Sequence, residues 1–226
     1  MRQQQAILKG RPLREIIDIA IIFFVIACVL GSLGESIYWG FDSLIHQGQF
    51  IWTSRRGFMY GPFAPLYGVG ILIGLMIFGF KNFKGWQCFV IAALAGGTYE
   101  FLASIWQELC FGTRSWDYSQ DFDSIGGRTK FSYLILWGLV GLILAKVLLP
   151  LINNFYNKLP KKSTHFILMI VLIFFIFNTI ITIAALVRQT NRHNHIEARN
   201  HIERWIDDTY PDKRIHSVFE GTEFIK

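Results

Sequence analysis

Five long stretches that hold almost no charged residue dominate this sequence, and short charged connectors separate them. They cover approximately residues 16–41, 63–80, 87–109, 131–152 and 166–187. Each stretch is long enough to cross about 30 Å of hydrocarbon as a helix, whatever its tilt. The pattern therefore predicts an all-α fold: a polytopic transmembrane bundle of about five spanning helices with a short polar C-terminal tail.

The distribution of charge divides the chain into three expected parts. Residues 1–15 form a basic N-terminal flank, residues 16–187 the transmembrane domain, and residues 188–226 the polar C-terminal tail. No small-residue cleavage site follows the first apolar run, so we expect this run to be retained as a span. The connectors leave no room for a soluble domain of any size.

The chain has a formal net charge of +6 and a pI near 9.3. Lys and Arg lie mainly beside apolar stretches, where anionic head groups attract them, so membrane lipids are the expected partners and nucleic acid is not. Ten of these residues flank the spans on the N-terminal side and five on the opposite side. This bias predicts a cell-membrane protein with a cytoplasmic N-terminus. The tail, with Arg188 and Arg192, would then lie outside against the same rule, unless a further crossing lies within residues 42–62 or 112–130.

Three glutamates lie within or at the end of predicted spans. An ionised side chain at the centre of a span costs about 2.5–3.5 kcal/mol, so each requires a partner or a role. Glu35 and Glu108 lie near the interface, where a purely anchoring role is the simpler interpretation for Glu108. Glu100 lies deeper and follows Gly96 and Gly97, which permit close approach of another helix. We therefore expect Glu100 to belong to a functional site.

The connector RRGFMYGPFAPLYGVG, residues 55–70, is rich in glycine and proline. These residues prevent a regular helix before Pro65 and leave backbone groups exposed in turns. At membrane depth such backbone must line a cavity or be buried against protein. Arg56 and the amides of Gly57 and Gly61 are candidates for binding an anion, while a broken helix entry packed by aromatic residues is the structural alternative.

The connector of residues 113–138 adds a second group of charges. Gly126 and Gly127 allow a turn before Arg128, and Asp117 is a potential ion-pair partner. Acids and arginines that converge on one membrane face predict a polar pocket, although a structural salt bridge from Glu100 to Arg128 stays an alternative. The candidate substrate-binding or proton-coupling residues are Glu35, Arg56, Tyr60, Glu100, Asp117, Tyr118 and Arg128.

Several kinds of chemistry lack a sequence signature. Cys28, Cys88 and Cys110 share no close spacing, so neither a disulfide framework nor a zinc site is expected. The tail histidines have no partners at a recognised ligand spacing, and we expect no metal and no cofactor. The sequence contains no GxxxxGK[ST] phosphate loop, HExxH motif or nucleophile elbow. This favours a non-enzymatic role, and any ATP-driven role would require another polypeptide.

The segments RRGFMYGPFAPLYGVG and SWDYSQDFDSIGGRTKFSYLILWG, with Glu35 and Tyr38 upstream, carry a resemblance to a known family. They resemble the bacterial family of small membrane proteins known as putative ABC-transporter type IV, or CmpB-like. The resemblance covers about residues 16–150, and IDDTYPDKRI in the tail is similar to a terminal pattern in some relatives. It implies a multi-pass membrane protein associated with transport.

Together these features favour a permease-like transport component whose Glu/Arg-lined pocket binds a polar or amphiphilic solute. Glu100 would be a proton or cation site beside Glu35, while Arg56 and Arg128 bind the anionic part of the substrate. Two alternatives stay open: an intramembrane enzyme acting on a lipid or lipid-linked substrate, with Glu100 or Asp117 as general base, and a non-catalytic membrane scaffold. Besides lipids, the candidate partners are a separate ATPase or other subunit and a second copy of the chain.

Overall fold

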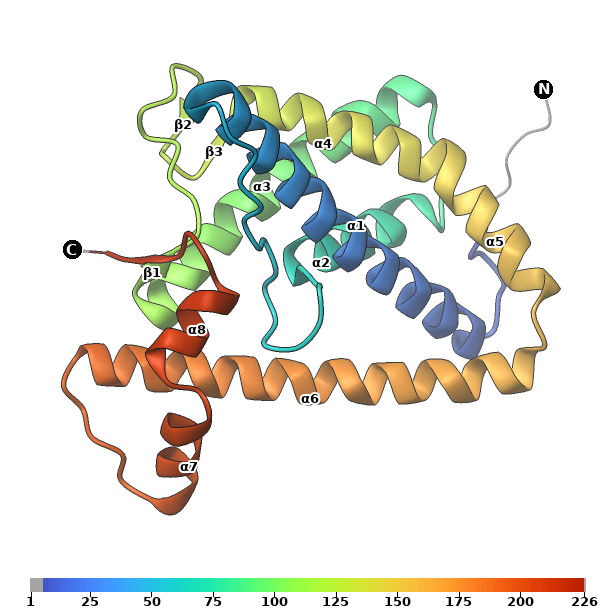
Figure 1. The fold of residues 1–226 in the computed structure, drawn as a ribbon. Helices are drawn as coiled ribbons and strands as arrows, with labels where there is room; N and C mark the ends of the chain where they lie inside the picture. The colour runs from blue at the N-terminus through green and yellow to red at the C-terminus, as the bar shows by residue number, and fades with distance from the viewer. Residues whose placement is uncertain (1–5, 226) are drawn as a thin grey trace. The chain divides into compact units, whose positions relative to one another are not determined.

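The computed structural model describes residues 6–225, and four helical runs in it are long and apolar enough to cross a membrane. They are α1 (Leu13–Gln47), α3 (Gly85–Phe111), the run from α4 (Phe131–Ile143) through the π-helical turn η1 (Leu144–Leu148) to α5 (Leu149–Lys158), and α6 (Lys161–His193) (Figure 1). The prediction of an all-α membrane helix bundle is confirmed.

Within residues 6–225 four helical runs, and not five, are long and apolar enough to span, so the predicted number is corrected at the second apolar stretch. That stretch forms only α2 (Pro65–Phe78), whose 14 residues extend about 21 Å, less than the hydrocarbon thickness. Gly61 adopts a left-handed conformation with φ +79° and Pro62 follows it, so the chain turns here instead of beginning a helix. Residues 48–64 contain no helix and form an extended connection (Figure 1).

The third long run changes its helical pitch near Pro150. Proline has no backbone N–H and its ring crowds the preceding turn, so a regular helix cannot continue through it unchanged. The five-residue π-helical turn Leu144–Leu148 lies directly before this site and absorbs the distortion. The ammonium group of Lys146, within the turn, donates to the carbonyl oxygen of Phe83 at 2.6 Å.

The chain forms two compact units, each described here by itself. Unit 1 comprises Met1–Ala27, Leu66–Ala103 and Asp117–Leu172, and unit 2 comprises Cys28–Pro65, Ser104–Trp116 and Ile173–Lys226. Since α1, α3 and α6 are continuous helices, each contributes residues to both units.

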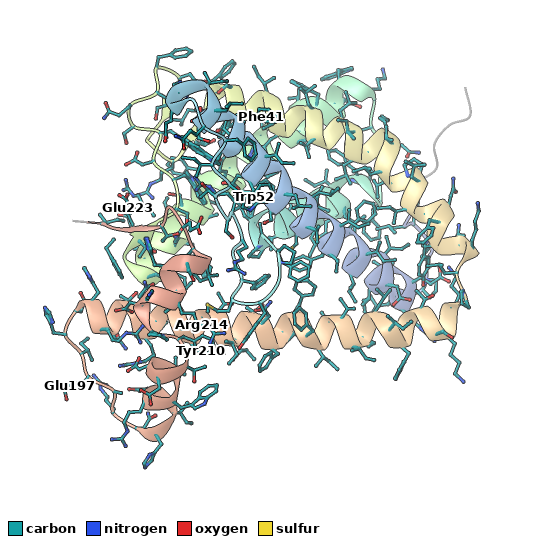
Figure 2. All side chains as sticks on the ribbon, viewed as in Figure 1. Phe41, Trp52, Glu197, Tyr210, Arg214 and Glu223 are labelled. Atoms are coloured by element: carbon teal, nitrogen blue, oxygen red, sulfur yellow. The ribbon has the colours of Figure 1, made fainter. Side chains whose placement is uncertain are left out.

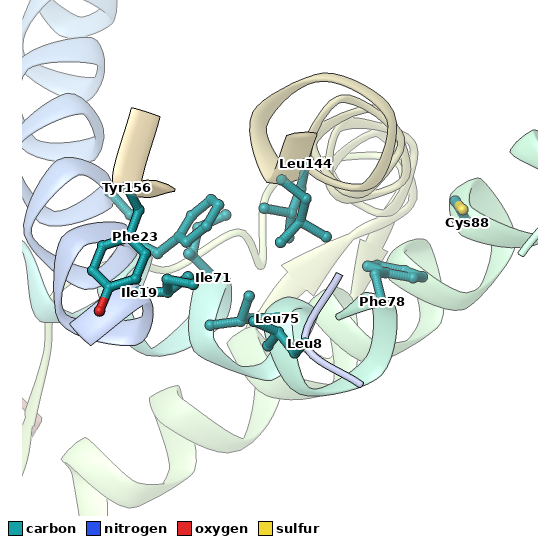
Figure 3. Packing of buried hydrophobic residues seen from close by; sticks show 11 residues of the cluster. Leu8, Ile19, Phe23, Ile71, Leu75, Phe78, Cys88, Leu144 and Tyr156 are labelled. Atoms are coloured by element: carbon teal, nitrogen blue, oxygen red, sulfur yellow. The ribbon is translucent and has the colours of Figure 1, made fainter. Parts of the chain in front are cut away.

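Unit 1 is held together by an apolar core that joins α1, α2, η1 and α5. Its buried residues include Ile19 and Phe23 of α1, Leu75 of α2, Leu144 of η1 and Tyr156 of α5 (Figure 3). The two-stranded hairpin of β2 (Ser124–Ile125) and β3 (Thr129–Lys130) precedes α4 in the same unit. Small residues bring the helices of this unit into close contact.

Unit 2 contains a second apolar core, built by α6 and the tail. Met59, Ala185, Ile206, Tyr210 and Ile215 are buried in it. The tail forms α7 (His201–Thr209), α8 (Asp212–Val218) and strand β4 (Glu223–Phe224), which pairs antiparallel with β1 (Thr113–Arg114). The tail is thus a packed part of this unit.

The close helix contacts in unit 1 yield a first prediction. A methyl group at Gly141 of α4 would lie 2.0 Å from Cβ of Ala92 on α3, so Gly141→Ala must push these helices apart. We expect a loss of about 1–3 kcal/mol in the free energy of unfolding, measured by thermal unfolding in detergent micelles.

The matched control is Gly34→Ala in α1, because a methyl group there meets no heavy atom within 4 Å. Alanine has the higher helix propensity, so this variant should be unchanged or more stable by up to about 1 kcal/mol. Equal losses in the two variants would show that the contact between α3 and α4 is not tight.

Candidate functional site

The structure distributes the seven predicted site residues over both units. Glu35, Arg56 and Tyr60 belong to unit 2, whereas Glu100, Asp117, Tyr118 and Arg128 belong to unit 1. The predicted residues therefore belong to two polar centres, one in each unit. A single pocket shared by all seven residues stays a prediction.

The centre in unit 2 is the non-helical segment around Tyr60, which is hydrogen-bonded to side chains of α6. The amide of Asn178 donates to the carbonyl oxygen of Tyr60 at 2.8 Å, and its carbonyl oxygen accepts from the N–H of Tyr60 at 3.2 Å. The N–H of Met59 donates to the hydroxyl of Thr182 at 3.0 Å. Side chains of α6 thus replace the backbone partners that the loop lacks.

This contact lies at the middle of α6. Asn178 is about 26 Å along the axis from Lys161, in a helix of 33 residues that extends about 50 Å. The side chain of Asn178 is fully buried. Asn178 and Thr182 were not among the predicted site residues, although the three polar residues within the apolar run FFIFNTIITI were a usable signal.

Aromatic contacts surround the same loop. The rings of Phe58 and Phe63 both contact that of Phe175 on α6, with centroid distances of 5.8 and 4.9 Å. The N–H of Gly57 donates to the carbonyl oxygen of Phe63 at 2.9 Å, which closes the loop on itself. The aromatic packing that the sequence suggested as a structural role is present, together with a polar attachment that it did not predict.

Two arginines precede this loop, and neither is fully hydrogen-bonded. The side chain of Arg55 is only 15% exposed, and its Nε lies 3.9 Å from a carboxylate oxygen of Glu35, too far for a hydrogen bond. Its guanidinium lies over the ring of Trp39, 4.6 Å from the centroid. Within residues 6–225, the buried Nε atoms of Arg55 and Arg56 have no hydrogen-bond acceptor.

The tail attaches to the same connection. The hydroxyls of Tyr60 and Tyr210 are 2.6 Å apart, and the carboxylate of Glu220 accepts from the N–H of Ser54 at 2.8 Å. Burial and the hydrogen bond with Tyr60 raise the pKa of Tyr210 to about 12, so its hydroxyl keeps its proton at neutral pH. Figure 2 shows Tyr210 beside Arg214, whose guanidinium lies 4.9 Å from the ring centroid.

An ion-pair network joins α7 to the end of α6. Arg188 is 3% exposed and donates to both carboxylate oxygens of Asp207, at 3.0 Å from Nε and 2.6 Å from Nη2. Arg192 donates to Asp207 as well. The hydrogen bond from Arg188 lowers the pKa of Asp207 below its ordinary range. This two-pronged contact fixes the tail to the helix that also carries Asn178.

The centre in unit 1 is Glu100, which is 5% exposed at about the middle of α3. One of its carboxylate oxygens accepts from the hydroxyl of Thr129 at 2.9 Å and from the indole N–H of Trp137 at 3.1 Å. Thr129 lies on β3 and Trp137 on α4, so the carboxylate connects three elements of the unit. Burial of Glu100 agrees with the expectation from the sequence.

The β2–β3 hairpin carries the other site residues of unit 1. Gly126 and Gly127 have φ of +61° and +72°, the left-handed conformation that this tight turn requires. Arg128 closes the turn with a hydrogen bond to the carbonyl oxygen of Ile125 at 3.3 Å. The glycine pair therefore places Arg128 directly before Thr129, the residue that contacts Glu100.

Asp117 and Tyr118 lie on the connector before the hairpin. Asp117 is exposed and accepts from the N–H of Ser119 at 2.8 Å, as in an Asx turn. The ring of Tyr118 contacts that of Tyr133 at a centroid distance of 5.1 Å, with Lys130 also 5.1 Å from the Tyr118 centroid. These contacts fit a structural role in the connector.

A second buried carboxylate in unit 1 was missed by the sequence analysis. Asp18 of α1 is fully buried and accepts from the hydroxyl of Tyr156 at 2.7 Å. The Nδ1 atom of His165 lies 2.6 Å from its other oxygen. Asp18 lies just inside the start of the predicted first span, and its partners are more than 130 residues away along the chain.

Unit 1 also contains a small cavity between α2, α3 and α4. Its volume of about 30 Å³ is enough for a water molecule or two. The lining is mostly apolar and includes Gly70, Gly96, Tyr99 and Trp137. Within residues 6–225, no group of three or more His, Cys, Asp or Glu side chains is arranged to hold a metal ion.

The contact between Asn178 and the loop yields a second prediction. Asn178→Leu leaves the N–H and carbonyl groups of Tyr60 without partners, which costs about 1–3 kcal/mol for each buried group. We expect a lower melting temperature and faster trypsin cleavage after Arg55 and Arg56. Asn154→Leu, at an exposed position of α5, is the control and should change neither. Unchanged cleavage in Asn178→Leu would contradict the attachment.

The pKa of Asp207 yields a third prediction. A carboxylate whose pKa is lowered in the folded state stabilises that state above its unfolded pKa of about 3.9, and this contribution disappears as the pH falls through the folded value. Asp207→Asn should lower stability at pH 7 by about 3 kcal/mol, because Arg188 is buried, and should flatten the acid-induced loss between pH 5 and 2. Thermal unfolding as a function of pH measures both.

The adjacent Asp208→Asn removes an equal charge from an exposed position and is the matched control. It should leave the pH profile unchanged. If both variants behave alike, the network of Arg188 does not stabilise the tail.

Comparison with known proteins identifies the family of this chain. No curated protein and no solved structure matches this chain. The model of one protein family, described as Putative ABC-transporter type IV, matches residues 22–183, which include α2, α3, α4, α5 and the loop held by Asn178. The chain is a membrane protein with transmembrane helices, and it belongs to this ABC-transporter-type family.

Proposed function

We propose that this protein is a permease-like component of a transport system and that its polar centres bind a polar or amphiphilic solute. The family supports a membrane component of ABC-transporter type. The finer proposal, movement of a solute through a Glu/Arg-lined recess, rests on the two polar centres.

The observation that carries this proposal is the non-helical loop held against the middle of α6 by Asn178 and Thr182. If α6 crosses the bilayer, this backbone lies near its midplane. Irregular backbone at that depth is tolerated only where protein buries it or where it lines a cavity. Discontinuous helices at this depth form substrate sites in many transporters.

Glu100 is the proposed proton or cation site. It is a buried carboxylate at the middle of a candidate span, where an ionisable group is expensive and points to a function. Two of its donors, Thr129 and Trp137, are uncharged and fix the orientation of the carboxylate. Arg128, next to Thr129, is the proposed partner for the anionic part of a solute.

The energy for transport must come from outside the described fold. The sequence has no phosphate-binding loop, so ATP-driven transport requires a separate ATPase subunit, which the family supports as a partner. An ion gradient acting through Glu100 is the alternative source. We propose the cell membrane as the location, with a cytoplasmic N-terminus.

A fourth prediction tests the function without knowledge of the solute. Membrane vesicles with and without the full chain are loaded with a metabolite extract, and a pH gradient or ATP is applied. Mass spectrometry should find solutes whose content in the vesicles depends on the chain. Glu100→Gln should abolish this dependence, while Glu223→Gln, an equal charge change at an exposed position, should preserve it.

Two results would contradict the proposal. The first is an identical solute content with and without the chain under both energy sources. The second is a chemical change in the vesicle lipids that Glu100→Gln prevents, because this outcome is expected of an intramembrane enzyme.

A further inference from the structure

We infer that Arg55, with its guanidinium over Trp39 of α1, is the centre of a binding site for a phosphate-class oxyanion. This inference deepens the proposed function by naming the chemical class of the ligand. The same chemistry is available from inorganic phosphate, from a phosphorylated solute or from a phospholipid head group.

The first argument is the hydrogen bonding of the arginines. A guanidinium has five N–H donors and no acceptor, and a buried donor without a partner costs about 1–3 kcal/mol. The Nε atoms of Arg55 and Arg56 are buried without an acceptor among the described residues. Such donors call for a group that offers several acceptors.

The second argument is the electrostatic surroundings of Arg55. Its nearest carboxylate, that of Glu35, stands at 3.9 Å and makes a loose ion pair. The carboxylate of Glu220 accepts a hydrogen bond from the N–H of Ser54. The guanidinium lies over the ring face of Trp39, 4.6 Å from the centroid, a contact that shields one face of the cation from water.

The third argument is the attachment of the loop. Met59 and Tyr60, three and four residues after Arg56, are bound to Thr182 and Asn178, and Ser54, directly before Arg55, is bound to Glu220. The backbone on both sides of the arginines is thus held. Binding to a pre-arranged guanidinium costs less ordering entropy than binding to a free side chain.

These features select the ligand class. A phosphate group presents three or more acceptor oxygens and no obligatory donor, and its geometry matches the two-pronged contacts of guanidinium. A neutral solute would leave the positive charge of Arg55 balanced only by the loose ion pair with Glu35. The negative charge of phosphate compensates it further.

The experiment uses the full chain in an uncharged detergent. One arm titrates inorganic phosphate against chloride at constant ionic strength, and the other adds micelles that contain phosphatidic acid or phosphatidylcholine. Melting temperature and tryptophan fluorescence report binding, since Trp39 contacts Arg55. Saturable binding of inorganic phosphate indicates a soluble ligand, and a response to phosphatidic acid alone indicates a lipid head group.

The variants decide whether the site is Arg55. Arg55→Gln should weaken binding at least tenfold, and Arg55→Lys should give an intermediate loss because lysine keeps the charge without the planar fork. Arg204→Gln, at an exposed position of α7, removes the same charge and should leave binding unchanged. Trp39→Phe should remove most of the fluorescence response.

Glu35→Gln keeps the inference testable if Arg55→Gln fails to fold. It removes the carboxylate nearest to Arg55, so phosphate binding should tighten severalfold. The inference is overturned if neither phosphate nor phosphatidic acid binds, if Arg55→Gln binds as well as the parent protein, or if Glu35→Gln weakens binding. If phosphate or phosphatidic acid binds but the vesicles move no solute, the transport proposal is refuted and the inferred binding site stands.

Discussion

The hydrogen bonds between Asn178 and the backbone of Tyr60 are the contact on which the arrangement of unit 2 depends. An extended chain segment carries unpaired N–H and carbonyl groups, and hydrocarbon offers none of the partners that water would supply. One amide side chain offers a donor and an acceptor at once, so it satisfies both backbone groups of a single residue. The sequence can therefore interrupt its second apolar stretch without leaving buried backbone unpaired.

The tail is attached to the C-terminal part of α6 and also contacts the loop. Arg188 binds Asp207, and this pairing brings α7 and Tyr210 to the loop, where the two tyrosine hydroxyls meet. The polar residues of α6 thus have two tasks: Asn178 holds the loop and Arg188 holds the tail that packs on it. Loop and tail consequently share one apolar core, with Met59 beside Ile206.

The sequence allowed the membrane class, the four long helical runs and the burial of Glu100 to be predicted, because apolar runs and an isolated acid are local signals. The second span was predicted wrongly, since hydropathy does not register that Gly61 and Pro62 delay the helix until Pro65. The partners of Asp18 and Asn178 could not be predicted. They lie more than 110 residues away along the chain, and only tertiary packing brings them together.

In both units, a connector that carries an arginine is hydrogen-bonded to a polar residue of a long helix. In unit 1, Thr129 is bound to Glu100 of α3, and Arg128 precedes it directly; in unit 2, Met59 is bound to Thr182 of α6, and Arg56 lies three residues earlier. Each connector is anchored by hydrogen bonds to polar side chains within a long helix. Since a guanidinium is flexible on its own, a fixed backbone beside it limits the positions it can reach. The polar residues of the long helices therefore determine where the arginines can act. In unit 2 these polar residues, Asn178 and Thr182, are uncharged.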